Sequence, residues 1–228
     1  MELSVEDFLG QSEPLTAALI PYVTDGPVGK MIHHPLVIQI NFQPLYCKMI
    51  NDAFAHKMDA LERYLGNNEF DSAIFVHERP YRLDALVEYV RDYGFDRSPA
   101  FWPTLSSVWT DSENIRENYD EWVWLWESTA PNRDLVMTDE EKSELANLPE
   151  KITIYRGIKV PEPNDPHGMS WTIDRDKAIW FANRLGGNGV LFTATIEKSK
   201  VLAHILRRGE SEIVVHPDEI IDARMDEL

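Results

Sequence analysis

Three short segments in the last third of the chain carry polar side chains among β-branched and aromatic residues. They are Ile152–Gly157, Gly168–Thr172 and Gly209–Val215. This composition is typical of β-strands and strand edges, and it predicts that the segments belong to one small sheet. Arg156 brings a cation to this sheet, Ser170 a hydroxyl, and Glu210 and Glu212 a pair of carboxylates. Groups of these kinds, delivered by neighbouring strands, indicate a nucleotide-binding cleft.

Each segment also has an ordinary structural explanation when it is considered alone. Arg156 beside a glycine can be a solvated or salt-bridged strand residue, and Ser170 can belong to a turn that caps the next helix. Glu210 and Glu212, two residues apart, share one face of the predicted strand and could form a solvated edge. Two like charges that close are mutually unfavourable, however, so their position beside Ile213-Val-Val requires a reason. The order of the three segments is therefore more informative than any one of them.

That order resembles a known enzyme family. The ordered motifs are Tyr155-Arg-Gly, then Ser170-Trp-Thr with Asp174-x-x-x-Ala178-x-x-Phe181-Ala182, then Glu210-x-Glu212. They resemble the mono-ADP-ribosyltransferases of the Arg–Ser–Glu type, especially their bacteriophage and bacterial-toxin branch. The resemblance covers residues 152–222. It implies that NAD is the substrate, that ADP-ribose is transferred to a protein target on arginine, and that nicotinamide is released.

The resemblance also implies which residues would bind NAD. Arg156 offers a rigid fork of donors that suits a phosphate. Gly157 leaves its backbone open, and in the family the backbone at this place holds the nicotinamide amide. Tyr155 and Phe181 would wall the nicotinamide pocket, with core packing as the equal alternative.

The catalytic roles follow from the same resemblance. Cleavage of NAD generates an oxocarbenium-like centre, as in glycoside hydrolysis. Glu212 would stabilise that charge and accept a hydrogen bond from the ribose, while Glu210 would orient or deprotonate the nucleophile. Ser170 would contact the ribose or orient the catalytic carboxylate, and Thr172 would contact NAD or cap the following helix. The chemistry needs no metal, and we expect none.

Two features depart from the family pattern and leave other functions open. The middle motif of the family is commonly Ser-Thr-Ser, whereas Trp171 and Thr172 follow the serine here. The segment before Glu210, residues 204–209, is short for a loop that recognises a target and has no aromatic residue. The second hypothesis is therefore an NAD glycohydrolase, with water as the acceptor. The third is a catalytically silent binding or inhibitor module that acts through its acidic surface.

Composition limits the class of protein. The chain has 228 residues, of which 43% are hydrophobic and 11% aromatic, as expected of a folded globular protein. Its net charge of −17 argues against extensive nucleic-acid binding and indicates either a basic protein partner or a role in solubility alone. No apolar run approaches the ~20 residues of a membrane helix, and the acidic N-terminus does not resemble a signal peptide. Cys47 is the only cysteine, so we expect a protein of the reducing cytoplasm, the host cytoplasm if a phage encodes it.

Periodicity and turn residues predict the elements that position these groups. Helices are expected over residues 6–9, 44–65, 81–93, 142–148 and 174–185, the fourth with a capping box at 138–141. Strands are expected over residues 73–77, 152–160, 190–196, 201–206, 211–216 and 220–224, although helix and strand are hard to separate in the first. Trp122, Leu125 and Trp126 share one helical face, which is either core or a surface for a ligand or partner. The fold class is thus α+β: a mainly helical region, 1–150, for target recognition or support, followed by a mainly antiparallel sheet, 151–228.

Overall fold

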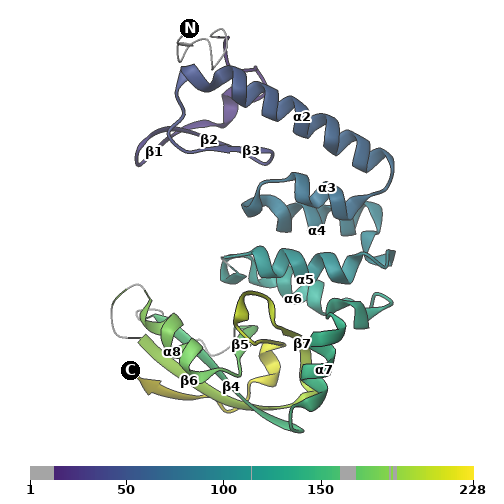
Figure 1. The fold of residues 1–228 in the computed structure, drawn as a ribbon, viewed down its shortest axis with the longest axis vertical. Coiled ribbons are helices and arrows are strands. Elements are labelled where there is room, and N and C mark those ends of the chain that lie inside the picture. The colour runs from purple at the N-terminus through teal and green to yellow at the C-terminus, as the bar shows by residue number, and fades with distance from the viewer. Residues whose placement is uncertain (1–12, 114, 160–167, 185, 187–188) are drawn as a thin grey trace, which may run out of the picture. The chain divides into compact units, whose positions relative to one another are not determined.

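The computed structural model describes residues 13–113, 115–159, 168–184, 186 and 189–228 (Figure 1). The chain divides into two compact units, residues 1–101 and residues 102–228, which we name the N-terminal and C-terminal units. Both units combine helices with antiparallel strands, which confirms the α+β class. The expected helix at 6–9 lies outside the described residues. No helix in the described part of the chain combines the length and apolar composition of a membrane span.

The N-terminal unit contains a small sheet that the sequence did not lead us to expect. Its strands are β1 (Val23–Gly26), β2 (Gly29–His34) and β3 (Val37–Gln39), paired in that order. Short 3-10 turns, η1 (Ile20–Tyr22) and η2 (Pro44–Tyr46), flank the sheet. The strands are only three to six residues long and are separated by glycine- and proline-containing turns, so they carry little periodic signal.

Three helices complete the N-terminal unit. They are α2 (Cys47–Gly66), α3 (Phe70–Val76) and α4 (Arg82–Tyr93), with 3-10 turns η3 (Arg79–Tyr81) and η4 (Phe95–Arg97). The predicted helices at 44–65 and 81–93 correspond to α2 and α4, and Gly94 closes α4 in the left-handed conformation at φ +67°. The predicted strand at 73–77 is wrong, because residues 73–76 lie in α3 and His77 is the C-cap of that helix. Ala73 and Ile74 are buried on one face of this helix. In so short an apolar run, the sequence pattern of a helix cannot be distinguished from that of a strand.

The C-terminal unit is built on a six-stranded antiparallel sheet with strand order β7-β8-β5-β4-β6-β9. Its strands are β4 (Lys151–Lys159), β5 (Ser170–Thr172), β6 (Gly189–Glu197), β7 (Val201–Ile205), β8 (Glu212–Val215) and β9 (Arg224–Glu227). The predicted strand at 220–224 is wrong: Ile220 is a buried loop residue, and β9 begins only at Arg224. The other predicted strands of this region are present.

Both faces of this sheet are covered within the unit. One face carries the alternating apolar residues of β4, β6 and β8, against which Leu145 and Leu148 pack. On β4, the opposite face meets helix α8 (Arg175–Asn183), whose Ala178 and Ala182 are buried (Figure 1). Asp174 caps α8 by accepting hydrogen bonds from the backbone N–H groups of Asp176 and Lys177.

Three further helices precede the sheet. They are α5 (Phe101–Asp111), α6 (Tyr119–Trp126) and α7 (Asp139–Asn147), with 3-10 turns η5 (Ile115–Asn118) and η6 (Arg133–Val136). Trp122, Leu125 and Trp126 are buried, so their shared face is core rather than a partner surface. We expected the character of the chain to change after residue 150, and the large sheet does begin at Lys151. The compact unit that contains this sheet nevertheless begins at Trp102.

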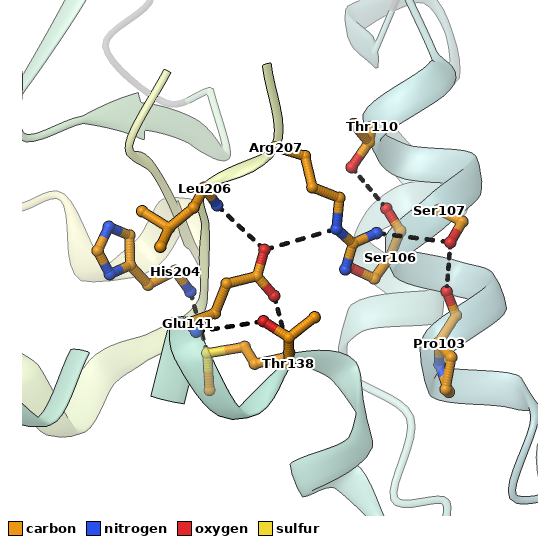
Figure 2. A network of polar contacts seen from close by, with 10 residues as sticks. Pro103, Ser106, Ser107, Thr110, Thr138, Glu141, His204, Leu206 and Arg207 are labelled. Carbon is orange, nitrogen blue, oxygen red and sulfur yellow. Dashed lines mark hydrogen bonds and ion pairs between the residues drawn. The ribbon is translucent and has the colours of Figure 1, made fainter. Parts of the chain in front are cut away.

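A buried carboxylate joins α7 to the sheet and to α5 (Figure 2). Thr138 and Glu141 form the predicted capping box at the start of α7. Glu141 Oε1 also accepts a hydrogen bond from the backbone N–H of Leu206 at 3.0 Å and pairs with Arg207 Nε at 3.5 Å. Arg207 in turn donates to the hydroxyls of Ser106 and Ser107 on α5. Glu141 and Arg207 together therefore connect α7, the turn after β7 and α5.

Substitution of Glu141 is expected to destabilise the C-terminal unit. Burial alone raises the pKa of Glu141, but the bonds from Thr138 and Leu206 and the charge of Arg207 outweigh it and hold that pKa below its ordinary value. The stabilisation is thus present above the ordinary carboxyl pKa and is lost as pH falls through the lowered pKa. Glu141→Gln should cost about 2 kcal/mol of unfolding free energy at neutral pH, measured by urea denaturation. Glu140→Gln, at an exposed neighbour, is the control, and an equal loss in both variants would contradict the prediction.

Candidate active site

The register of three adjacent strands places predicted site residues side by side. Tyr155 on β4 pairs with Thr172 on β5, and Thr172 pairs with Glu212 on β8. Residues that pair directly in antiparallel strands project from the same face of the sheet, and so does Ser170, two residues before Thr172. Gly157 on β4 shares this face and meets α8. The predicted hydroxyl and carboxylate groups are therefore neighbours on one surface.

These residues line a cavity of about 820 Å³. β4 and β5 pair only at Tyr155 and Thr172, and the cavity extends between the residues of β4 that follow Tyr155 and the segment that leads into β5. All of the predicted site residues contribute to its wall: Tyr155, Arg156, Gly157, Ser170, Thr172, Phe181, Glu210 and Glu212. The structure thus brings the predicted set together at one place.

Glu212 is held by two donors that bind the same oxygen. Ser170 Oγ donates a short hydrogen bond to Glu212 Oε1, and the indole Nε1 of Trp109 donates to the same atom at 3.1 Å. No described residue donates to Oε2. The described residues therefore fix the carboxylate through one oxygen, on a side chain that lines the cavity.

The environment of Glu212 makes its ionisation costly. Burial raises the pKa of the Glu212 carboxyl above its ordinary value, and the nearby charge of Glu210 acts in the same direction. The hydrogen bonds from Ser170 and Trp109 and the charge of Arg208 lower that pKa without cancelling the rise. A carboxylate of raised pKa in a cleft is a common property of catalytic groups.

This raised pKa predicts a pH dependence of stability with a definite sign. Because folding favours the protonated form of Glu212, its contribution to stability is full below the ordinary carboxyl pKa and is lost as pH rises through the raised one. Glu212→Gln removes this ionisation. The melting temperature of the variant relative to wild type should therefore increase as pH is raised through that pKa. Glu197→Gln, at an exposed site at the end of β6, is the control for the chemical change itself.

The side chain of Arg156 extends from β4 to the backbone of β5. Its NH1 atom donates to the backbone carbonyl of Ser170 at 2.7 Å. Gly168 makes room for the guanidinium, because a Cβ atom there would lie 2.2 Å from Arg156 Cζ. Arg156 thus supports the strand that carries Ser170 and also presents a cation to the cavity.

Gly157 and Thr172 have structural roles that the sequence interpretation did not assign to them. A Cβ atom on Gly157 would lie 1.8 Å from the carbonyl oxygen of Ala178, so the glycine permits the close approach of α8. The Thr172 hydroxyl donates to the carbonyl of Glu210 at 2.7 Å and accepts from the backbone N–H of Asp174 at 3.0 Å. Thr172 therefore ties β5 to the turn before β8, and Asp174, not Thr172, caps α8.

Glu210 does not share a strand face with Glu212, and this part of the sequence interpretation is wrong. β8 begins at Glu212, and Glu210 lies in the preceding turn, after η8 (Arg207–Gly209). The reason is the backbone of this turn, in which Arg208, Gly209 and Ser211 have φ values of +66°, +63° and +44°. The turn nevertheless places Glu210 at the cavity wall beside Glu212.

The sequence interpretation missed the wall that the helical part of the unit contributes. It consists of Glu113, Ile115, Arg116, Glu117 and Tyr119, in and beside η5. It also missed Trp109, whose indole N–H donates to Glu212. No local pattern marks a tryptophan on one helix as the partner of a carboxylate on a distant strand. The remaining turns of the unit, η7 (Lys198–Lys200) and η9 (Pro217–Glu219), do not contribute to the cavity.

The cavity combines cations with carboxylates and an apolar wall. Arg116, Lys159 and Arg184 line it in addition to Arg156, and Phe181 contributes an aromatic ring over which Arg184 lies at 5.0 Å. Such a site can bind a phosphate-bearing molecule through its cations and place a carboxylate oxygen against a developing positive charge. Comparisons with protein-family models, with curated proteins and with solved structures found no match to this chain.

Proposed function

We propose that the protein is a mono-ADP-ribosyltransferase that transfers ADP-ribose from NAD to a target protein. The observation that carries the proposal is the arrangement of Glu212, which two donors hold through Oε1 in the wall of the cavity that Arg156 also lines. The order of the motifs in the sequence supports the same activity. An arginine of the target is the acceptor we favour, because the motif has glutamate at position 210.

The size and charges of the cavity suit NAD as the substrate. Its volume of about 820 Å³ lies within the range of about 300–1,000 Å³ that small-molecule sites occupy. NAD carries a pyrophosphate, for which Arg156, Arg184 and Lys159 supply positive charge. Tyr155 and Phe181 supply ring surface for the nicotinamide.

The proposed reaction breaks one bond and forms one. The bond from ribose C1′ to the nicotinamide nitrogen breaks, and that nitrogen keeps the electron pair. Glu212 Oε2 accepts a hydrogen bond from the ribose and stabilises the positive charge that develops on the sugar. Glu210 takes the proton that the guanidinium of the target loses as its nitrogen bonds to C1′. The products are free nicotinamide and the ADP-ribosylated protein.

NAD hydrolysis is the second candidate function, and the turn before β8 favours it. This turn is short, contains no aromatic residue, and is tied down by contacts of Leu206 and Arg207 with Glu141. A turn fixed in this way offers little adaptable surface to a protein target. Water would then replace the guanidinium as the nucleophile, and Glu210 would take its proton.

One assay separates the candidate functions. The purified protein is incubated with a bacterial lysate and NAD labelled on the adenylate, and both released nicotinamide and labelled macromolecules are measured. Transferase activity predicts label on a protein band with wild type and none with Glu212→Gln. Nicotinamide release with an equal yield of free ADP-ribose and no labelled band would select the hydrolase. Neither signal in lysates of several hosts would reject both and leave a binding module.

A further inference from the structure

Trp109 reaches Glu212 from outside the sheet. It lies on α5, 103 residues before Glu212 in the chain, and only 1% of its surface is exposed. Its ring packs edge to face against Trp122 and Trp126, with centroid distances of 5.0 Å and 5.5 Å. Trp109 does not line the cavity, so its contact with the site is the hydrogen bond from Nε1 to Glu212 Oε1.

We propose that Trp109 is a positioning residue for Glu212: its indole N–H, together with the Ser170 hydroxyl, fixes Oε1 so that Oε2 is directed at the substrate. The part of this proposal that concerns substrate rests on the proposed function. One donor on Oε1 would leave the carboxyl free to rotate about its terminal torsion, which is soft. Two donors from different elements, β5 and α5, restrict that rotation.

The indole is itself held in place by its surroundings. The edge-to-face contacts with Trp122 and Trp126 fix the plane of the ring, and therefore the direction of its N–H. The helix is anchored one turn earlier, where Ser106 and Ser107 accept hydrogen bonds from Arg207 (Figure 2). Arg207 is paired with Glu141, so α5, α7 and the turn before β8 form one connected support for Glu212.

The variant Trp109→Phe removes the donor and keeps an aromatic ring. If the proposal is right, kcat for NAD cleavage falls about tenfold or more, as for loss of a hydrogen bond to a charged group, while KM changes little because Trp109 does not touch the cavity. The Trp109 hydrogen bond favours the ionised form of Glu212, so its loss moves the acid limb of the pH–rate profile to higher pH. The charges of Glu210 and Arg208, which also act on Glu212, are unchanged in the variant.

Trp122→Phe is the matched control, because phenylalanine keeps an aromatic ring against Trp109 and leaves the donor of the Trp109–Glu212 hydrogen bond in place. Trp122 is fully buried in the same aromatic cluster, and its indole N–H has no hydrogen-bond partner among the described residues. Both variants leave a similar void in the core, but only Trp109→Phe removes a donor from Glu212. Equal kcat and equal pH profiles in the two variants would overturn the proposal.

A second measurement tests the proposal without relying on catalysis. The melting-temperature difference between Glu212→Gln and its parent is followed against pH, first in wild type and then in the Trp109→Phe background. The midpoint should move to higher pH in that background, and an unmoved midpoint would overturn the proposal. If wild type does not cleave NAD and the midpoint still moves, the proposed function fails and the action of Trp109 on Glu212 stands. Should Trp109→Phe not fold, incorporation of 3-benzothienylalanine at position 109 replaces the N–H by sulfur at nearly constant size.

Discussion

Glu212→Gln is expected to lower the rate of NAD cleavage by about 10²–10³-fold, as for removal of a group that stabilises charge in a transition state. The amide oxygen of glutamine can replace Oε1 and accept the bonds from Ser170 and Trp109. Its NH₂ group then replaces Oε2, so a dipole that repels positive charge occupies the place of the carboxylate oxygen. The measurement is nicotinamide release under single-turnover conditions, which separates the chemical step from product release.

The same substitution should not destabilise the protein. Burial raises the pKa of Glu212, which means that ionisation opposes folding at neutral pH, and a neutral side chain of equal size avoids that cost. We therefore expect a melting temperature equal to or above that of wild type at pH 7, together with the loss of activity. Glu197→Gln should keep both properties of wild type. If Glu212→Gln were inactive because it is unfolded, the loss of activity would have no catalytic explanation. That result would contradict the expected combination of lost activity and retained stability.

Gly157→Ala is expected to have the largest effect on stability. The added methyl group would lie 1.8 Å from the Ala178 carbonyl oxygen and 2.9 Å from the Ala182 amide nitrogen. Both atoms belong to the backbone of α8, so no side-chain rotation relieves the overlap and the helix must move away from β4. Overpacking of this kind should cost about 3 kcal/mol or more, which corresponds to a fall in melting temperature of roughly 6–12 °C.

The control for this substitution is Gly66→Ala, at the end of α2. A Cβ atom there meets no atom within 4 Å, so the same chemical change should leave the melting temperature unchanged or slightly raised. Thermal denaturation followed by circular dichroism measures both variants. If the melting temperature of Gly157→Ala equalled that of wild type, α8 would not be packed against β4 as described.

The sequence predicted the elements whose pattern is local. The apolar positions of α2 and α4 recur at helical spacing, and Thr138 and Glu141 mark the start of α7 by their own hydrogen bonds. The hairpin strands β1–β3 were missed because they are short. The run at 73–77 was misassigned because helix and strand bury the same few residues of so short a segment.

The candidate site was predictable as far as its residues lie on adjacent strands. The register of β5 and β8 brings Ser170 close to Glu212, whereas Arg156 reaches the same cavity through its long side chain, which donates to the Ser170 carbonyl. The place of Glu210 was not predictable, because the left-handed backbone of Ser211 breaks the alternation that the sequence pattern assumes. Trp109 was not predictable either, since a contact across 103 residues leaves no spacing to detect.

The hydrogen bond between Trp109 and Glu212 also limits where recombination can divide the gene and still keep the site intact. A fragment of residues 151–228 would retain every residue of the three motifs, but it would lack one of the two donors to Glu212 and the partner of Leu206 and Arg207. Recombination at the start of β4 would therefore transmit the motifs without the support that orients them. The smallest segment that contains the complete site therefore includes Trp109 on α5. We expect substitutions at Trp109 and Glu212 to occur together among related proteins.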